Sequence, residues 1–291
     1  MKGDEKLWRI LNDKLEMLGA AGRLGEAQRV AETALELARR AFPPDHPSLA
    51  LSYERLGLIY DQEDRTDEAT ACFNKALEII ERIEPTDERA IYRLARRLAA
   101  LSEGGSEEET TIGFYEKAIQ AGTALGNVPH SEMGALLNNL ALTCRRAGQN
   151  ERAEQFYLRA LELYQKQLGS RHGDVAAVLN NLGVFYTNER RFEEGERAHQ
   201  RALAIRQAVK PTLAADIAQS QCNLAVLYHA RLDFTRAEEL YRKSLDTWET
   251  VEHPSEDYEI AVANYADLLR SLGKKRKAGS IEARARKRRA R

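Results

Sequence analysis

A fixed period of 42 residues constrains this chain more than any other feature of its sequence. The segment LLNNLALTCRRAG at 136–148 returns as LNNLGVFYTNERR at 179–191 and as QCNLAVLYHARLD at 221–233. A second series of small residues, each followed by Leu or Ile, keeps the same spacing: Ala34, Ala76, Ala118, Ala160, Ala202 and Ser244. A period of this size is typical of solenoid arrays, in which each repeat packs on its neighbours.

Each period carries two helical patterns separated by a short turn. In the fourth repeat, Leu137, Leu140 and Cys144 fall at i, i+3 and i+7, which places them on one face of a helix. Residues 147–150 then break the pattern, and a second amphipathic pattern follows over 153–164. Such a hairpin cannot bury its outer faces alone, so we expect neighbours on both sides.

The small residues of both helices resemble those of a tetratricopeptide repeat. They are Gly57, Ala99, Ala141, Gly183 and Ala225 on the first helix, and Ala27, Ala69, Ala153 and Ala237 on the second. The longer period and the segment LGSRHGDVAAVLNNLG at 168–183 resemble the repeats of kinesin light chains and their bacterial relatives. The resemblance implies an all-α fold, a right-handed α-solenoid of about seven helix–turn–helix repeats with a basic C-terminal capping helix.

The expected solenoid covers residues 1–273, and 274–291 form the basic capping helix of the last repeat. The predicted repeats are 5–46, 47–86, 87–129, 130–172, 173–213, 214–255 and 256–291. The third repeat is the softest, because Gly104–Gly105 lies at its internal turn and Gly113 weakens its second helix. Ser106 with Glu109 makes a capping box for that helix.

Composition and motifs argue against several classes of function. The sequence has no run of eighteen apolar residues, so we expect no membrane span. The N-terminal residues show no signal peptide. Three cysteines within helical patterns favour free thiols in a reducing compartment, so the cytoplasm is the expected location. No phosphate loop, GxSxG or CxxC motif appears, and the histidines lack metal-ligand spacing. We therefore expect no enzyme, no catalytic residues, no cofactor and no metal.

A row of asparagines is the first candidate for a binding site. The same position of successive first helices carries Arg55, Arg97, Asn139, Asn181, Asn223 and Asn264. Asn138 and Asn180 precede two of these asparagines by one residue, and Asn188 follows Asn181 by seven residues in the same helical pattern.

In the architecture that the resemblance implies, these side chains line the concave surface. Packed helices lie about 8–10 Å apart, and an extended chain advances about 3.3 Å per residue, so one side chain would meet about every third residue of an extended peptide. An amide side chain offers both a donor and an acceptor to a peptide backbone. The alternative is that these residues bond neighbouring helices and hold the array together.

A cluster of arginines is the second candidate. Arg55, Arg93, Arg96 and Arg97 come from the second and third repeats, and Arg146 ends the first helix of the fourth. Guanidinium groups that reach the groove would bind a carboxylate of a partner peptide. The alternative is a solvated face with weak local ion pairs. His229 is a further candidate for lining the groove, beside Asn223.

The basic terminal segment is the third candidate. Residues 274–291 hold ten Lys or Arg and one Glu, a net charge of +9, while the rest of the chain holds 34 basic and 44 acidic residues. Such a segment can bind nucleic acid or close the array as a terminal cap. Because interleaved aromatic residues are lacking, we favour the cap.

These patterns predict a non-enzymatic adaptor or scaffold that binds an extended, acidic or polar segment of a protein partner. The chain is expected to be a monomer or weak homo-oligomer that does not bind membranes. Two alternatives stay open: a module that self-associates, and a regulator that contacts nucleic acid through its basic tail.

Overall fold

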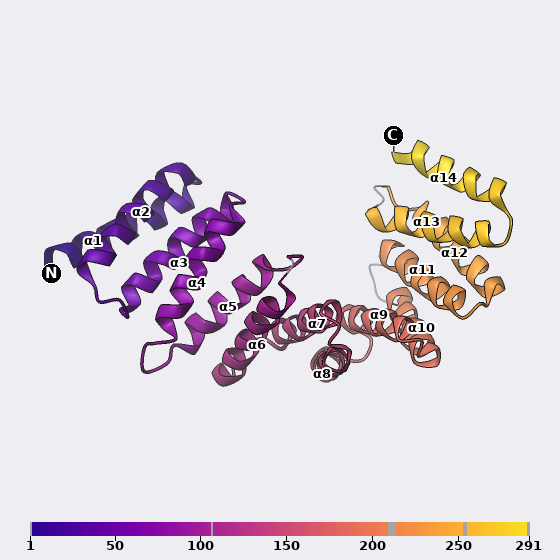
Figure 1. Cartoon of the computed structure of the whole chain (residues 1–291), viewed down its shortest axis with the longest axis horizontal. Coiled ribbons are helices and arrows are strands. Elements are labelled where there is room, and N and C mark those ends of the chain that lie inside the picture. The colour runs from indigo at the N-terminus through magenta and orange to yellow at the C-terminus, as the bar shows by residue number, and fades with distance from the viewer. Residues whose placement is uncertain (1, 106, 209–213, 253–254, 290–291) are drawn as a thin grey trace. The chain divides into compact units, whose positions relative to one another are not determined.

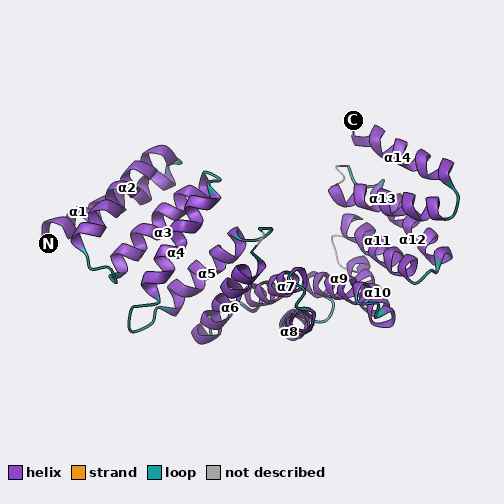
Figure 2. Cartoon of the chain, in the orientation of Figure 1, coloured by secondary structure: helices purple, strands orange, loops and turns teal. Residues whose placement is uncertain are grey.

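The computed structural model describes residues 2–105, 107–208, 214–252 and 255–289, and these parts of the chain contain helices and loops but no strand (Figure 2). The helices are α1 (Lys2–Ala20), α2 (Leu24–Ala41), α3 (Pro47–Gln62), α4 (Thr66–Ile80), α5 (Glu88–Leu101), α6 (Glu108–Leu125), α7 (His130–Arg146), α8 (Asn150–Leu168), α9 (Gly173–Asn188), α10 (Phe192–Ala208), α11 (Ala214–Ala230), α12 (Phe234–Trp248), α13 (Glu256–Ser271) and α14 (Lys275–Arg289).

The chain divides between Gln149 and Asn150 into two compact units, α1 to α7 and α8 to α14. Within each unit, consecutive helices pack together as helical hairpins, and each second helix also packs on the first helix of the next hairpin (Figure 1). The division falls inside the fourth predicted repeat. The all-α fold of tetratricopeptide-like repeats that the sequence predicts is confirmed.

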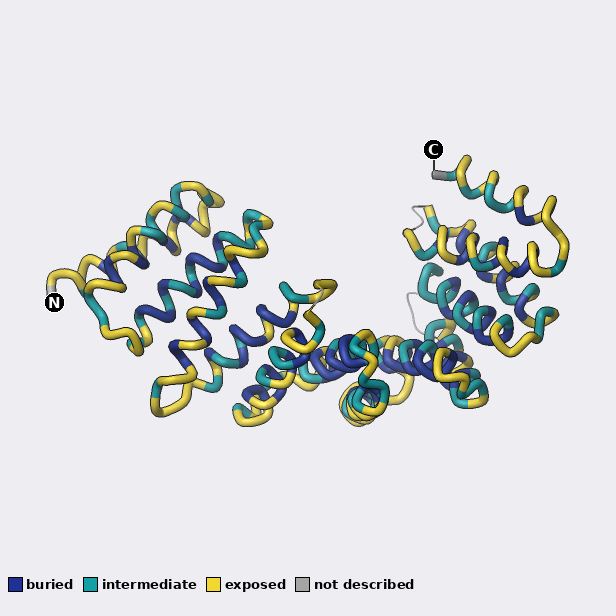
Figure 3. The backbone as a smooth tube through the Cα atoms, in the orientation of Figure 1, coloured by how far each residue is buried: buried dark blue, intermediate teal, exposed yellow. Residues whose placement is uncertain are grey.

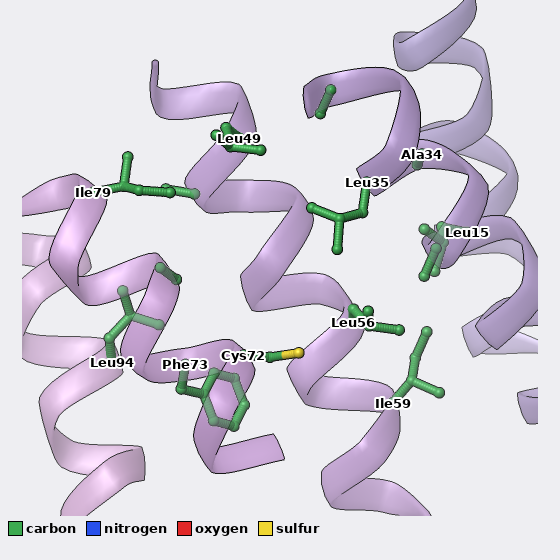
Figure 4. Close-up of a cluster of buried hydrophobic side chains, with 14 of the residues drawn as sticks. Leu15, Ala34, Leu35, Leu49, Leu56, Ile59, Cys72, Phe73, Ile79 and Leu94 are labelled. Carbon is green, nitrogen blue, oxygen red and sulfur yellow. The ribbon is translucent and has the colours of Figure 1, made fainter. Parts of the chain in front are cut away.

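Each unit has its own apolar core. In the first unit, Leu56, Phe73 and Leu94 come from three successive helices and are at most 5% exposed (Figure 4). In the second unit, Tyr241 and Trp248 pack with residues of α11 and α13. Buried residues form stripes along the helices, and exposed residues cover the opposite faces (Figure 3).

The repeated small residues of the second helices are part of these cores. Ala76, Ala118, Ala160, Ala202 and Ser244 are all fully buried. A larger side chain at any of these positions would push neighbouring helices apart, because protein interiors are close-packed.

Internal turns also repeat at the 42-residue spacing. Residues with positive φ recur at Gly22, Asp64, Gly148, Arg190, Leu232 and, after a one-residue deletion, Gly273. The residue after each of these donates its N–H to a carbonyl five residues earlier, as from Arg191 to Tyr186 at 2.8 Å. These bonds satisfy carbonyls that the end of a helix leaves free.

The start of α6, the second helix of the third repeat, differs from the predicted capping box of Ser106 with Glu109. α6 begins at Glu108, and the side chain of its N-cap residue, Glu107, makes no capping hydrogen bond. Ser106 lies outside the described residues. Although Gly113 was expected to weaken it, α6 is 18 residues long.

Candidate interaction face

Two of the predicted arginines of the first unit are tied to neighbouring first helices. Arg55 on α3 donates to the Asn12 carbonyl on α1 at 2.8 Å and pairs with Glu16 at 2.6 Å. Arg93 on α5 makes a two-pronged bond to Glu54 on α3, at 2.5 and 2.8 Å. Because the Glu54 side chain is buried, this bond neutralises a charge that water barely reaches. Hydrogen bonding to Glu54 raises the pKa of Arg93.

Arg96 and Arg97 make fewer hydrogen bonds and ion pairs than Arg55 and Arg93. Arg97 donates one hydrogen bond, to Asp61 at 3.3 Å, and its guanidinium carbon lies 5.9 Å from the centre of the Phe73 ring. A guanidinium nitrogen of Arg96 lies 3.6 Å from Glu132 on α7. Both arginine side chains remain more than a third exposed. They can therefore reach a ligand from solvent.

The polar residues of α7 meet the turn that follows α5. Asn139 donates to Glu103 at 3.2 Å, and Asn138 donates to Asn139 at 3.4 Å. The Tyr115 hydroxyl on α6 also donates to Glu103. Glu103 is thus a shared acceptor that joins the end of α5 to α6 and α7.

Arg146 lies near the end of the same helix, α7. Its guanidinium group donates to the Thr143 hydroxyl at 3.3 Å and lies 3.9 Å from the Glu108 carboxylate. The side chain is 40% exposed, so these contacts leave it open to solvent.

The asparagines of the second unit also link first helices. Asn223 on α11 donates to the buried Asn180 on α9 at 3.0 Å. Burial raises the pKa of the Cys222 thiol to about 11, although a hydrogen bond with Asn264 on α13 acts in the opposite direction. Asn181 is partly buried, and Asn188 is exposed at the end of α9.

His229 lies against its own hairpin. Its ring centre is 6.0 Å from that of Phe234 and 6.4 Å from that of Tyr241, both on α12. These edge-to-face contacts hold the imidazole at the junction of α11 and α12. They direct it toward α12, whereas Asn223 bonds to α9.

Sequence reasoning missed a repeated ion pair that joins successive hairpins of the second unit. Glu154, Glu196 and Glu238 are 42 residues apart, and each binds a cation from the next hairpin. The pairs are Glu154 with Arg191 at 2.6 Å, Glu196 with Arg231 at 3.3 Å, and Glu238 with Lys274 at 2.6 Å. The 42-residue spacing of the glutamates was the signal that could have revealed it.

The basic helix α14 uses many of its charges in packing. Lys277 and Lys274, the residue just before the helix, bind Glu238, and Arg284 pairs with Glu249. Arg288 donates to the carbonyls of Trp248 and Val251. Ala290 and Arg291 lie outside the described residues.

A shallow hollow of about 560 Å³ lies where α14 meets the rest of its unit. It is lined by Glu249, Tyr258 and residues of α14 that include Ser280 and Lys287. Three cations of α14, Arg284, Lys287 and Arg288, line this hollow together with apolar surface, and it is open to solvent, unlike the enclosed and mostly apolar pockets that bind small molecules.

The described residues contain no helix that is both long and apolar enough to cross a membrane. In the same parts of the chain, no group of three His, Cys, Asp or Glu side chains could hold a metal ion. Cys72, Cys144 and Cys222 are buried free thiols.

The tetratricopeptide repeat model matches residues 10–82, 91–166, 132–208 and 174–249. The chain belongs to the tetratricopeptide repeat family. Proteins of this family are typically non-enzymatic, and the fold implies a role in protein–protein interaction. No curated protein matches the chain.

Several solved structures resemble this tetratricopeptide repeat protein. BtubC (BKLC) of P. vanneervenii is 28% identical, with a TM-score of 0.60 over 80% of this chain and 94% of its own. A tetratricopeptide repeat protein of Parabacteroides merdae is 16% identical, with a TM-score of 0.63 over 96% and 92%. The kinesin light chain TPR-like repeats of Podosopora anserina are 18% identical, with a TM-score of 0.55 over 72% and 100%. The last two likenesses show the fold alone.

Proposed function

We propose that this protein is a non-enzymatic adaptor or scaffold that binds an extended, acidic or polar segment of a protein partner on its first helices. The observation that carries the proposal is the unused hydrogen-bonding capacity of Arg97. A guanidinium group has five N–H donors, and Arg97 makes a single hydrogen bond, to Asp61. A partner carboxylate would take up donors that the fold leaves available.

Apolar side chains accompany the polar ones on the first helices. Leu142, Val184 and Val226 each follow an asparagine by three residues and are partly exposed. Residues three apart share a helix face. A segment bound to the second unit could therefore place apolar side chains on Val184 and Val226 while its backbone meets the amides.

The cross-helix bonds favour the structural alternative for some residues. Arg55 and Arg93 hold neighbouring helices through carbonyls or carboxylates, so we assign them to the fold. Arg97 and Arg146 of the first unit, and Asn181 and Asn188 of the second, are the residues that we assign to binding. The cytoplasm remains the proposed location.

Selection from a random peptide library on the full chain tests this proposal. We expect peptides that bind the first unit to lose about tenfold in affinity for Arg97→Ala, and peptides that bind the second unit to lose as much for Asn181→Ala, as substitutions at the centre of an interface do. Arg159→Ala on α8 is the matched control, since Arg159 is exposed on a second helix. Equal losses for all three variants, or no selected peptide, would contradict the proposal.

Nucleic-acid binding through α14 is less well supported. Lys274, Lys277, Arg284 and Arg288 already bind groups of the neighbouring helices. These contacts favour a terminal cap.

A further inference from the structure

Two acidic residues occupy the same position in successive repeats of the first unit. Asp61 lies in the last turn of α3, and Glu103 lies 42 residues later, in the turn after α5. Each accepts a hydrogen bond from a residue 36 positions further along, on the next first helix. Asp61 accepts from Arg97 at 3.3 Å, and Glu103 accepts from Asn139 at 3.2 Å. The chain's own carboxylates therefore hold donors of the face that we propose for binding.

The charge at this position changes along the chain. The equivalent residues of the other repeats are Gly19, Arg145, Thr187, His229 and Arg270. Thr187 donates to the carbonyl of Gly183 in its own helix at 2.7 Å, and His229 lies against α12. An acid at this position therefore occurs only in the second and third predicted repeats, which also supply most of the candidate arginines.

The contact between Asp61 and Arg97 is weak enough to be replaced. A single hydrogen bond joins these side chains, which are 33% and 37% exposed. Glu54 and Arg93 differ, because two hydrogen bonds join them and the Glu54 side chain is buried. An exposed ion pair changes an equilibrium constant by no more than about fivefold. A partner carboxylate that forms a two-pronged bond can therefore displace Asp61 from Arg97.

Glu103 fills a second place that suits a carboxylate. The buried Tyr115 donates its hydroxyl proton to Glu103, and Asn139 donates an amide proton to the same side chain. Glu103 itself is exposed, and Gly104 and Gly105 follow it. Because glycine restricts the backbone least, the turn can carry Glu103 away from these donors. Tyr115 and Asn139 would then present two donors to a carboxylate of the partner.

We propose that Asp61 and Glu103 are internal competitors of the partner. In the unbound protein they hold Arg97 and Asn139, and carboxylates of the bound segment take their place. A segment without carboxylates offers these donors nothing stronger than the chain's own groups, so it gains no affinity there. The two acids thereby make the first unit selective for acidic segments. This inference rests on the proposed function and adds the residues that set its specificity.

Selected peptides that lose affinity for Arg97→Ala are the probe, and titration calorimetry on the full chain measures their binding. Asp61→Asn and Glu103→Gln should each raise the affinity by about fivefold, because each removes a competing charge and keeps the shape of the side chain. Asp64→Asn is the matched control. It removes the same charge three residues from Asp61, and no side chain of the described chain donates a hydrogen bond to Asp64. It should change the affinity by less than about twofold.

Amide versions of the same peptides, with Asn for Asp and Gln for Glu, identify the cause. They should bind the original chain more weakly and gain nothing from Asp61→Asn or Glu103→Gln. Circular dichroism checks that each variant is folded. Acidic peptides that bind both variants no more tightly, or that gain equally from Asp64→Asn, would overturn this inference and leave the proposed function standing. A selection that yields no peptide for the first unit would overturn both.

Discussion

The imidazole ring of His199 occupies the space that a side chain at Gly183 would need. A Cβ atom on Gly183 would lie 2.5 Å from Cε1 of His199. Gly183→Ala should therefore destabilise the protein by about 1–3 kcal/mol, since an overpacked core must shift.

Urea unfolding measures this effect, and Gly113→Ala is the control. Gly113 lies within α6, and nothing stands within 4 Å of the place that a Cβ atom would take there. Alanine at this position should stabilise the helix by about 0.5–1 kcal/mol. Similar changes at both glycines would contradict the packing argument.

His199 should make stability depend on pH. Burial and the charge of Arg206 lower its pKa to about 4, against the weaker effect of the Gly183 carbonyl. Below about pH 6.5 the unfolded chain binds a proton on this histidine that the folded chain excludes. The free energy of unfolding should thus fall by up to about 3 kcal/mol as the pH falls from 6.5 to 4.

His199→Phe should remove this component of the pH dependence. Phe73 occupies the equivalent position of the second repeat, opposite Gly57, so the hairpin accommodates that ring. Unfolding measured at several pH values compares the two proteins. An identical acid dependence would show that His199 is not its source.

Arg93→Ala should destabilise the first unit. It leaves the Glu54 carboxylate buried without its partner, at a cost of about 2 kcal/mol after allowing for the exposure of Arg93. Arg96→Ala, which removes an exposed pair, should cost less than about 0.5 kcal/mol. Thermal unfolding distinguishes the two, and equal losses would argue against a structural role for Arg93.

Leu232→Gly should stabilise the turn between α11 and α12. Leu232 has a φ of 66°. This conformation costs a non-glycine residue about 1 kcal/mol. Gly148→Ala, at the equivalent position with a φ of 74°, should shift stability in the opposite direction. The midpoints of denaturant unfolding measure both changes in stability. If the two midpoints shifted in the same direction, the positive φ of these positions would not be the cause.

The helices could be predicted from sequence because their patterns are local and repeat. Leu137, Leu140 and Cys144 are buried as their spacing indicates. The groups that accept hydrogen bonds from the candidate arginines and asparagines could not be predicted in the same way. Glu54 and Arg93 are 39 residues apart, so their pairing depends on the rotation of packed helices. For the same reason, the contacts of His229 with α12 did not follow from its position in α11.

Hydroxyl-radical footprinting with a selected peptide tests the central claim most directly, because it reports which side chains a partner covers. A peptide bound to the first unit should protect Leu142, and one bound to the second unit should protect Val184 and Val226, while Leu158 on α8 and Leu232 should stay unprotected. Protection confined to Leu158, Leu232 or α14 would contradict binding on the first helices.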